Sequence, residues 1–374
     1  MFRRLCTSFT AALFVATMAA TATAAGQGQT PAPKKPTGAS GAAPAAALKK
    51  FVAKRLPWGD PDISGNFTTK DEANTPLERP DEFAGKRIED VTPTELAAVR
   101  AARQQQAVES APFITGNRNL GIAIGVPIHW LDHLDAQNSR PWFVTDPPDG
   151  KIPPLSEEGK KRVDGITTYL VTAPTANSTL DRSPQDRCIA WGIGPARILP
   201  SVYGMSHEIL QTKDYVAIRL EMIHETRIVP IEGRGAARPH NSSRLRSYYG
   251  DPVGRWEGDT FVVETTNYKM LSGGPLNNRL PFRGASEGLR TVERFTRVAP
   301  NKLEYSATFE DPAMWTRPWT FSIPWTEDDT QAIHEYACHE GNYGIRNILA
   351  GARADQKRGI EPSNGPAVPL DQQE

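Results

Sequence analysis

The sequence predicts a mostly β protein in which antiparallel strands close into a barrel. Five runs in the second half of the chain alternate apolar and polar residues, which is typical of strands with one buried face. The chain holds 32 Pro and 30 Gly residues, and many short strands joined by rigid turns explain this composition better than a helical bundle does. We therefore expect a barrel that can enclose a small ligand, with a β-sandwich as the alternative.

The alternating runs lie between residues 215 and 343 and predict the strands of a lipocalin-like barrel. They are Tyr215–Ile231, Asp259–Tyr268, Leu289–Val298, Lys302–Asp311 and Trp315–Trp325, followed by a sixth run that begins at Ala332. The N-terminal third is expected to wrap the barrel with loops and one or two short helices. The clearest helix has Thr92 as its N-cap, Pro93 in its first turn and Glu95 to complete a capping box. It is expected to end near Ala107.

The chain is expected to hold a single folded domain between less ordered ends. Residues 25–50 are poor in aromatic and β-branched residues, which is typical of a disordered linker. A β-rich domain with an N-terminal wrapping arm is predicted over residues 51–355, and a disordered tail over residues 356–374. Within the arm, Ser156 is expected to cap a single helical turn, and residues 165–187 are expected to form a polar loop.

Residues 1–24 have the layout of a secretory signal peptide. Two arginines precede an apolar stretch over Leu5–Ala20, and Ala22–Ala24 form an A-x-A cleavage pattern. A membrane anchor is the alternative, but the stretch is too short and too rich in Ala and Thr to be a good membrane span. We therefore expect cleavage between Ala24 and Ala25, and a periplasmic or extracellular protein without membrane attachment.

The cysteines predict one disulfide bond. Cys6 would be removed with the signal peptide, which leaves Cys188 and Cys338 in the mature chain. An even pair in an oxidising compartment is expected to form a disulfide. Two independent buried thiols are the alternative.

Charge and motifs exclude several classes of function. The 43 basic and 43 acidic residues give a formal net charge of zero, which gives no support for nucleic-acid binding. The chain has no P-loop, dinucleotide or C-x-x-C motif. No cofactor is therefore predicted. His129 and His133 have a spacing that can bind a divalent metal on a helix, but a packed loop histidine and a surface histidine are the favoured interpretation.

Alternation places one histidine on an apolar strand face. His224 shares its parity with the apolar residues of the first run, whereas Glu225 and Arg227 fall on the opposite face. A core histidine bonded to the backbone is one interpretation. The other is a general base inside a cavity, where a neutral imidazole is easily tuned.

Two further polar side chains interrupt apolar faces. Glu293 lies between an apolar and an aromatic residue, where a carboxylate is costly unless it is paired or functional. Arg283, in the preceding loop, is its candidate partner, and His339 lies in the sixth run. If these strands are neighbours, a His/Glu pair can perform acid–base chemistry while an arginine holds a negative charge.

Aromatic residues on the same strands could form a ligand wall. Tyr305, Trp315 and Trp319 share the parity of apolar neighbours, and Arg317 interrupts the last run. The wall is either core packing, which is favoured, or a stacking surface for a sugar or an aromatic molecule. His240 is expected at the mouth of this site.

Motifs across residues 58–353 resemble a widespread, uncharacterised family of secreted bacterial β-rich proteins. Those that carry the resemblance include PDISGNF, TPLERPDEFAGK, DPPDGKIPPL, RCIAWG, EMIHETRIVP, GRWEGDTFVVETTNY, FRGASEGLRTVERFTR, EDPAMWTRPWT and EYACHEGNYG. The resemblance implies one β-rich domain and carries over no catalytic residues and no substrate. The chain departs from the family pattern at HWLDHLDAQNSRPW, a segment that could tune ligand choice.

Together these features predict a secreted enzyme of the acid–base type. It would be a metal-independent lyase, isomerase or hydrolase acting on a small carbohydrate-like or aromatic molecule in the barrel. His224 or His339 would be the base, Glu293 the acid or orienting group, and Arg283 the charge-stabilising group. A lipocalin-like binding protein without catalysis is the alternative. The sequence leaves the oligomeric state open.

Overall fold

The computed structural model describes most of the chain beyond residue 50. The described residues are 51–73, 75–114, 139–172, 178–182, 184, 186–190, 194–200, 204–235, 239–269, 284–330 and 332–360. The predicted signal peptide and linker lie outside these residues, as do His129, His133 and Arg283. The chain divides into the units Met1–Lys49 and Lys50–Glu374, and the second unit holds everything described below.

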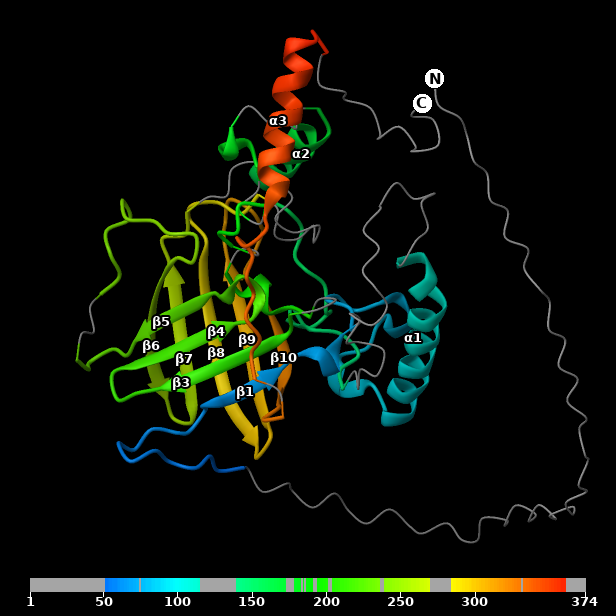
Figure 1. Cartoon of the computed structure of the whole chain (residues 1–374). Helices are drawn as coiled ribbons and strands as arrows, with labels where there is room; N and C mark the ends of the chain where they lie inside the picture. Colours follow the sequence, from blue (N-terminus) through cyan, green and yellow to red (C-terminus); the bar gives the residue numbers. More distant parts are fainter. Residues whose placement is uncertain are drawn as a thin grey trace, which may run out of the picture. The chain divides into compact units, whose positions relative to one another are not determined.

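Ten strands of the described residues form one antiparallel sheet that curls into a nearly closed barrel (Figure 1). They are β1 (Gly65–Thr68), β2 (Val144–Asp146), β3 (Ser206–Gln211), β4 (Tyr215–Leu220), β5 (Thr226–Pro230), β6 (Asp251–Glu257), β7 (Thr260–Thr266), β8 (Arg290–Ala299), β9 (Lys302–Glu310) and β10 (Trp319–Glu327). Their order is β5-β4-β3-β1-β10-β9-β8-β7-β6, with β2 paired to β10 beside this path. The predicted barrel is confirmed, because a single sheet curls round on itself where a sandwich needs two sheets.

The barrel has a seam between β5 and β6. Nine antiparallel strands lie on the path, and an odd number makes the two end strands run parallel to each other. Only one parallel bridge joins them, between Ile231 and Gly254, where the Glu232 amide donates to the Gly254 carbonyl over 2.7 Å. A Cβ at Gly254 would lie 2.9 Å from Val229 Cγ1. The absence of a side chain at Gly254 therefore lets the two strands approach. Side-chain packing holds β5 and β6 together there, where a full ladder of backbone hydrogen bonds is missing.

The connection between β4 and β5 reverses the alternation of the first predicted strand. The run Tyr215–Ile231 was predicted as one strand, which is wrong, because a 3-10 turn over Met222–His224 interrupts it. Ile223 and His224 adopt φ angles of 57° and 40°, a left-handed region that a β-branched residue rarely enters. The turn shifts the parity by one residue. Beyond it, Glu225, Arg227 and Val229 are buried and Ile228 is exposed.

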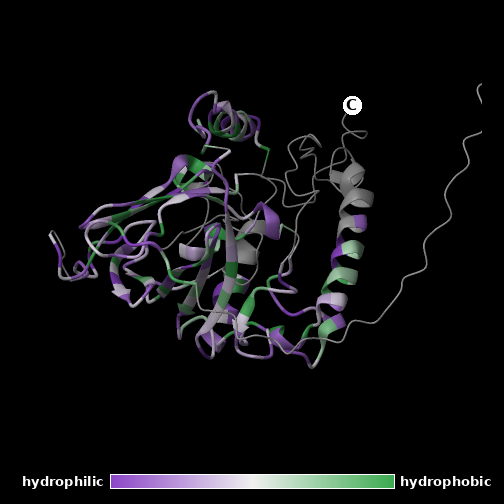
Figure 2. Ribbon diagram, turned by 90° about the horizontal axis from the view of Figure 1, so that it is seen from below, coloured by the Kyte–Doolittle hydropathy of each residue, from purple (hydrophilic) through white to green (hydrophobic). Residues whose placement is uncertain are grey.

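Aromatic rings fill much of the barrel interior. Along the strands, hydrophobic residues alternate with hydrophilic ones (Figure 2). The buried aromatic side chains of the barrel include Phe67, Phe261, Phe295, Tyr305, Phe309, Trp315, Trp319, Phe321 and Trp325. The rings of Phe309 and Trp319 stack with centroids 4.7 Å apart. This packing is the core that the alternation predicts.

Three α-helices lie in the described part of the chain. They are α1 (Pro93–Ile114), α2 (Glu157–Thr172) and α3 (Tyr343–Lys357), with 3-10 turns η1 (Lys70–Glu72), η2 (Asp81–Phe83), η3 (Ile88–Asp90), η6 (Thr179–Asp181), η7 (Gly194–Ile198) and η8 (Met222–His224). The predicted capping box of α1 is confirmed, because Thr92 Oγ1 accepts the Glu95 amide and Glu95 Oε2 accepts the Thr92 amide. None of these helices is long and apolar enough to cross a membrane.

The second helix is longer than the sequence predicts. Ser156 does cap its first turn, since Ser156 Oγ accepts the Gly159 amide over 2.9 Å. The helix then continues to Thr172. The prediction of a polar loop from residue 165 is therefore wrong for the first part of that segment, because the hydrogen-bonded backbone of an established helix propagates readily.

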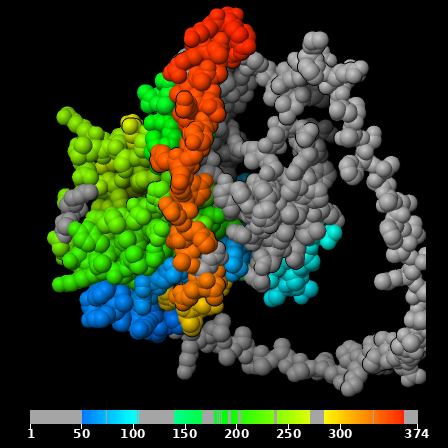
Figure 3. Space-filling view, in the orientation of Figure 1, coloured from blue at the N-terminus to red at the C-terminus, as the bar shows by residue number. Residues whose placement is uncertain are grey.

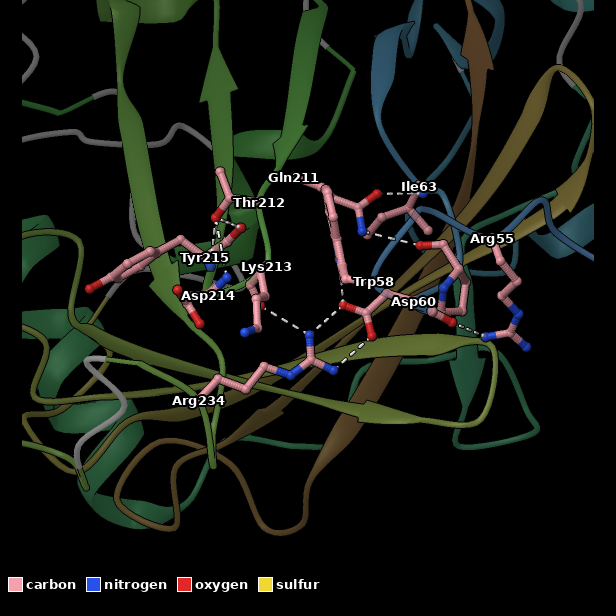
Figure 4. A network of polar contacts seen from close by, with 12 residues as sticks. Arg55, Trp58, Asp60, Ile63, Gln211, Thr212, Lys213, Asp214, Tyr215 and Arg234 are labelled. Atoms are coloured by element: carbon pink, nitrogen blue, oxygen red, sulfur yellow. Dashed lines mark hydrogen bonds and ion pairs between the residues drawn. The ribbon is translucent and has the colours of Figure 1, made fainter.

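A polar network ties the segment before β1 to two turns of the barrel (Figure 4). Arg234 donates to both carboxylate oxygens of Asp60 over 2.5 and 2.7 Å, and Trp58 Nε1 donates to the same group over 3.0 Å. Gln211 at the end of β3 accepts the Ile63 amide over 2.7 Å. These contacts hold the N-terminal segment against the turns that follow β3 and β5.

The predicted disulfide between Cys188 and Cys338 is present, with Cα atoms 5.6 Å apart. It anchors the C-terminal segment, drawn orange to red in Figure 3, to the loop before η7. Residues 332–342 form no strand, so the prediction of a sixth strand there is wrong. Every β10 residue from Trp319 to Thr326 already pairs with β9, and β2 and β1 occupy its other edge.

Loss of this disulfide is expected to lower the free energy of unfolding by about 2–4 kcal/mol. The bond joins residues 150 positions apart, and it therefore restricts a long loop in the unfolded chain. The double variant Cys188→Ser/Cys338→Ser, unfolded in urea, measures the effect. The wild type under a reducing agent should reach the same value. An unchanged unfolding midpoint in both would contradict a stabilising role.

Candidate functional site

The structure does not bring the predicted catalytic residues together. His224 is exposed, and its Nδ1 lies 2.8 Å from the carbonyl oxygen of Tyr336 in the C-terminal segment. Its predicted place on the inner face is wrong, because the strand ends four residues earlier at Leu220. His339 is also exposed, in the turn after the disulfide. Neither histidine faces the barrel interior.

Glu293 does lie inside the barrel, but with a partner that the sequence did not predict. Arg227 donates to both of its carboxylate oxygens over 2.5 and 2.9 Å, and Tyr305 donates to Oε1 over 2.8 Å. All three side chains are buried. The predicted partner Arg283 lies outside the described residues. Both oxygens of Glu293 are therefore engaged by partners inside the barrel.

A second buried ion pair joins Arg197 in η7 to Glu225, beside this network. Arg197 Nε donates to the Gly194 carbonyl over 2.8 Å, and its guanidinium lies 4.8 Å from the centre of the Tyr249 ring. Burial raises the pKa of Glu225, while the positive charges of Arg197 and Arg227 oppose this shift. Two charge pairs thus share the barrel interior with the aromatic core.

Arg227 and Glu225 were missed because the turn after β4 reverses parity. One signal in the sequence pointed to a hidden cation. A carboxylate on the apolar face of the Leu289–Val298 run requires a positive partner, and Arg227 on the first run was assigned to the opposite face. The sequence does not display the pairing across the barrel that makes Arg227 the partner.

The residues of the predicted aromatic wall belong to the core. Trp315 and Trp319 are at most 2% exposed, and their rings contact each other with centroids 5.6 Å apart. Arg317, between them in sequence, is exposed and bonds Asp146 over 3.0 Å. The favoured interpretation, core packing, therefore holds for both tryptophans.

His240 is the predicted site residue that lines a cavity. The cavity has a volume of about 450 Å³ and lies on the outer side of the seam between β5 and β6. Its lining residues among those described are Glu232, Gly233, Pro239, His240, Val253, Gly254, Arg255 and Glu264. We call this cavity the seam cleft. The connection from β5 to β6 contributes four of these residues, and β6 and β7 contribute the rest.

The imidazole of His240 lies between two carboxylates. Nδ1 is 3.4 Å from Asp251 Oδ2, and Nε2 is 3.7 Å from Glu264 Oε1. Asp251 is 5% exposed and accepts the backbone amide and the side-chain amide of Asn241 over 2.5 and 2.9 Å. Arg290 donates to Glu264 Oε2 over 2.7 Å, and this bond lowers the pKa of Glu264. Both carboxylates are therefore held in position by their own partners.

This arrangement can accept and donate a proton at the wall of an open cleft. Imidazole is the side chain that most readily changes charge near neutral pH. A buried carboxylate at Nδ1 can orient the ring and leave Nε2 for a ligand, and such contacts are often long before the ligand is bound. Sequence reasoning missed Asp251, Glu264 and Arg290, because nothing in their local pattern separates them from ordinary strand residues.

Metal binding finds no support in the described part of the chain. No group of three or more His, Cys, Asp or Glu side chains there is arranged to hold a metal ion. A second cavity of about 310 Å³ lies near the start of α1 and is mostly apolar. Its one charged lining residue among those described, Arg140, bonds Glu304 over 2.5 Å. The seam cleft is thus the better candidate for polar chemistry.

Comparison with known proteins does not assign this chain to a family. No model of a known protein family matches the chain, and a search of curated proteins finds no match. The family resemblance of the motifs stays a prediction. The function is therefore argued from the seam cleft.

Proposed function

We propose that this protein binds a small hydroxylated, carbohydrate-like molecule in the seam cleft, where His240 acts as the acid–base group. The observation that carries the proposal is a cavity of about 450 Å³ with an imidazole between two positioned carboxylates. Carboxylates accept hydrogen bonds from hydroxyl groups, and the imidazole can do so or donate. The proposal agrees with the predicted class of enzyme, a metal-independent acid–base catalyst. It differs from the prediction in the location of the site, which is the seam cleft and not the barrel interior.

The proposed place of action is outside the cytoplasm. The Cys188–Cys338 disulfide is typical of a non-reducing compartment. The predicted signal peptide supports the same placement.

Binding without catalysis is the second candidate, and one observation favours it. His240 Nδ1 has no hydrogen-bond partner among the described residues. It lies 3.4 Å from Asp251 Oδ2, but the two groups do not form a hydrogen bond. An imidazole that is not oriented by a hydrogen bond binds ligands but is a weaker general base. Formation of a product from a bound ligand separates the two candidates.

Replacing His240 with alanine is expected to weaken ligand binding roughly tenfold. The substitution removes the hydrogen bond between the imidazole and a ligand hydroxyl, and a hydrogen bond to a charged group contributes about 1.5 kcal/mol or more. Saturation-transfer NMR with a panel of neutral mono- and disaccharides measures binding, and the same samples report any product. His339→Ala, which changes an exposed histidine outside the cleft, is the matched control. Equal binding by both variants, or no binding of any sugar by the wild type, would overturn the proposal.

A further inference from the structure

The C-terminal helix α3 is exposed along most of its length and forms part of the outer surface in Figure 3, where it is drawn orange to red. Leu349 is its one buried residue, and Ile345 and Ala352 are half-buried. These three residues lie on one side of the helix, because spacings of three, four and seven residues return to the same face. That side rests against the protein, and the remaining surface of α3 is open to a partner.

Three basic side chains follow the exposed side of α3. Arg346, Arg353 and Lys357 are spaced by seven and four residues, which aligns them in a stripe of about 16 Å along the helix. All three are exposed, and none has an ion-pair or hydrogen-bond partner for its side chain among the described residues. The one acidic residue of the helix, Asp355, pairs with Arg358. The stripe therefore complements a surface of negative charge.

Exposed apolar groups lie at both ends of this stripe. Tyr343 begins the helix, is 67% exposed, and lies three residues before Arg346, so the two share a face. Ile360 follows the helix and is 48% exposed, and its amide donates to the Asp355 carbonyl over 3.0 Å. Apolar groups are stabilised at the interface of a lipid bilayer, whereas a hydrated polyanion offers them no such environment. The formal net charge of zero also gives no support for binding a long nucleic acid.

We propose that α3 binds the surface of an anionic phospholipid membrane, with the basic stripe at the headgroups and Tyr343 in the interface. Basic residues close to an anionic leaflet are each attracted to it, and tyrosine suits this boundary because its ring is apolar and its hydroxyl is polar. The binding is peripheral, because Leu349 keeps the apolar side of the helix against the protein. It does not depend on the proposed function of the seam cleft. It departs from the predicted absence of membrane attachment, which was inferred from the N-terminal segment alone.

Flotation with lipid vesicles tests this surface. Residues 25–374 are used, so that the apolar segment of the predicted signal peptide cannot contribute. The protein is expected to float with vesicles of phosphatidylcholine and phosphatidylglycerol, and not with phosphatidylcholine alone. Added salt should release it, because exposed charges are screened over about 10 Å at 0.1 M.

The triple variant Arg346→Gln/Arg353→Gln/Lys357→Gln is expected to bind these vesicles about a hundredfold more weakly, because each basic residue near an anionic surface strengthens binding about fivefold. The matched control, Lys54→Gln/Lys213→Gln/Arg244→Gln, removes three exposed cations outside α3 and should bind like the wild type. Unchanged thermal unfolding shows that both variants are folded.

Three results would overturn the proposal. The first is equal flotation of the wild type and the α3 variant, and the second is an equal loss in both triple variants, which would make overall charge responsible. The third is a wild type that does not float with phosphatidylglycerol. If that protein instead binds heparin or duplex DNA through the same three residues, the partner is a soluble polyanion and not a membrane.

Discussion

Replacing Arg227 with methionine is expected to lower the free energy of unfolding by about 3–5 kcal/mol. The substitution removes both bonds to Glu293 and leaves only Tyr305 to satisfy a carboxylate that is fully buried. A buried charge without its partner cannot recover the hydration that it lost on folding. Urea unfolding at neutral pH measures the loss.

The double variant Arg227→Met/Glu293→Met is the decisive companion. It removes both charges, and we expect it to recover most of the stability, because apolar groups of similar volume often replace a buried ion pair without loss. Arg317→Met, which breaks the exposed contact with Asp146, is the control and should cost less than about 1 kcal/mol. If the loss in Arg227→Met is no larger than in this control, the buried network is not needed for stability.

Acid is expected to destabilise the protein through His207, in β3. Its imidazole is fully buried and stacks on Trp325 with ring centroids 4.5 Å apart. Neither ring nitrogen has a hydrogen-bond partner in the described part of the chain. Burial lowers the pKa of His207 to about 3, against about 6.5 for a histidine in an unfolded chain. The folded state therefore excludes a proton that the unfolded state binds.

The sign and the pH range follow from these two pKa values. Above about pH 6.5 neither state is protonated at His207, and its contribution to stability does not change. As the pH falls from 6.5 toward 3, only the unfolded state takes up the proton, so stability decreases by about 1.4 kcal/mol per pH unit. Below about pH 3 the folded state is protonated as well, and the loss reaches its limit.

The variant His207→Phe tests this contribution, because phenylalanine keeps a ring against Trp325 and cannot be protonated. Between pH 7 and pH 5, the wild type should lose about 2 kcal/mol more than the variant. Unfolding in urea at the two pH values gives the difference, in which the remaining titrating groups cancel. His339→Phe, at an exposed position, should keep the wild-type dependence. If His207→Phe is as acid-sensitive as the wild type, another group is responsible.

Much of the barrel could be predicted from the sequence, because its strands carry a strict alternation. Strands β7 to β10 all lie within or close to the predicted runs. The capping box at Thr92 and Glu95 was also predictable, since both partners lie within one turn. The helix after Ser156 was predicted too short, and the run at Ala332 was wrongly predicted as a strand. An alternating run forms a strand only where the edge of a neighbouring strand is free to pair with it, and both edges of β10 are already occupied.

Only one residue of the candidate site was predicted from the sequence. His240 was assigned to ligand binding and lines the seam cleft, whereas His224 and His339 are exposed and Glu293 is locked in an ion pair. The carboxylates that flank His240 come from β6 and β7. Their approach to His240 depends on how β5 and β6 meet at the seam, and no local pattern describes that contact.

The sequence by itself determined which side chains share a face within each strand, because successive residues point to opposite sides of a sheet. It also supplied the two cysteines and the turn-forming residues. Only the tertiary structure decided which face is inside after a turn, which strands meet, and which charges pair. Arg227 and Glu293 are 66 residues apart and meet across the interior. His240 lines the seam cleft because β5 and β6 meet there without a full ladder. These contacts depend on sheet closure, which is a property of the whole barrel.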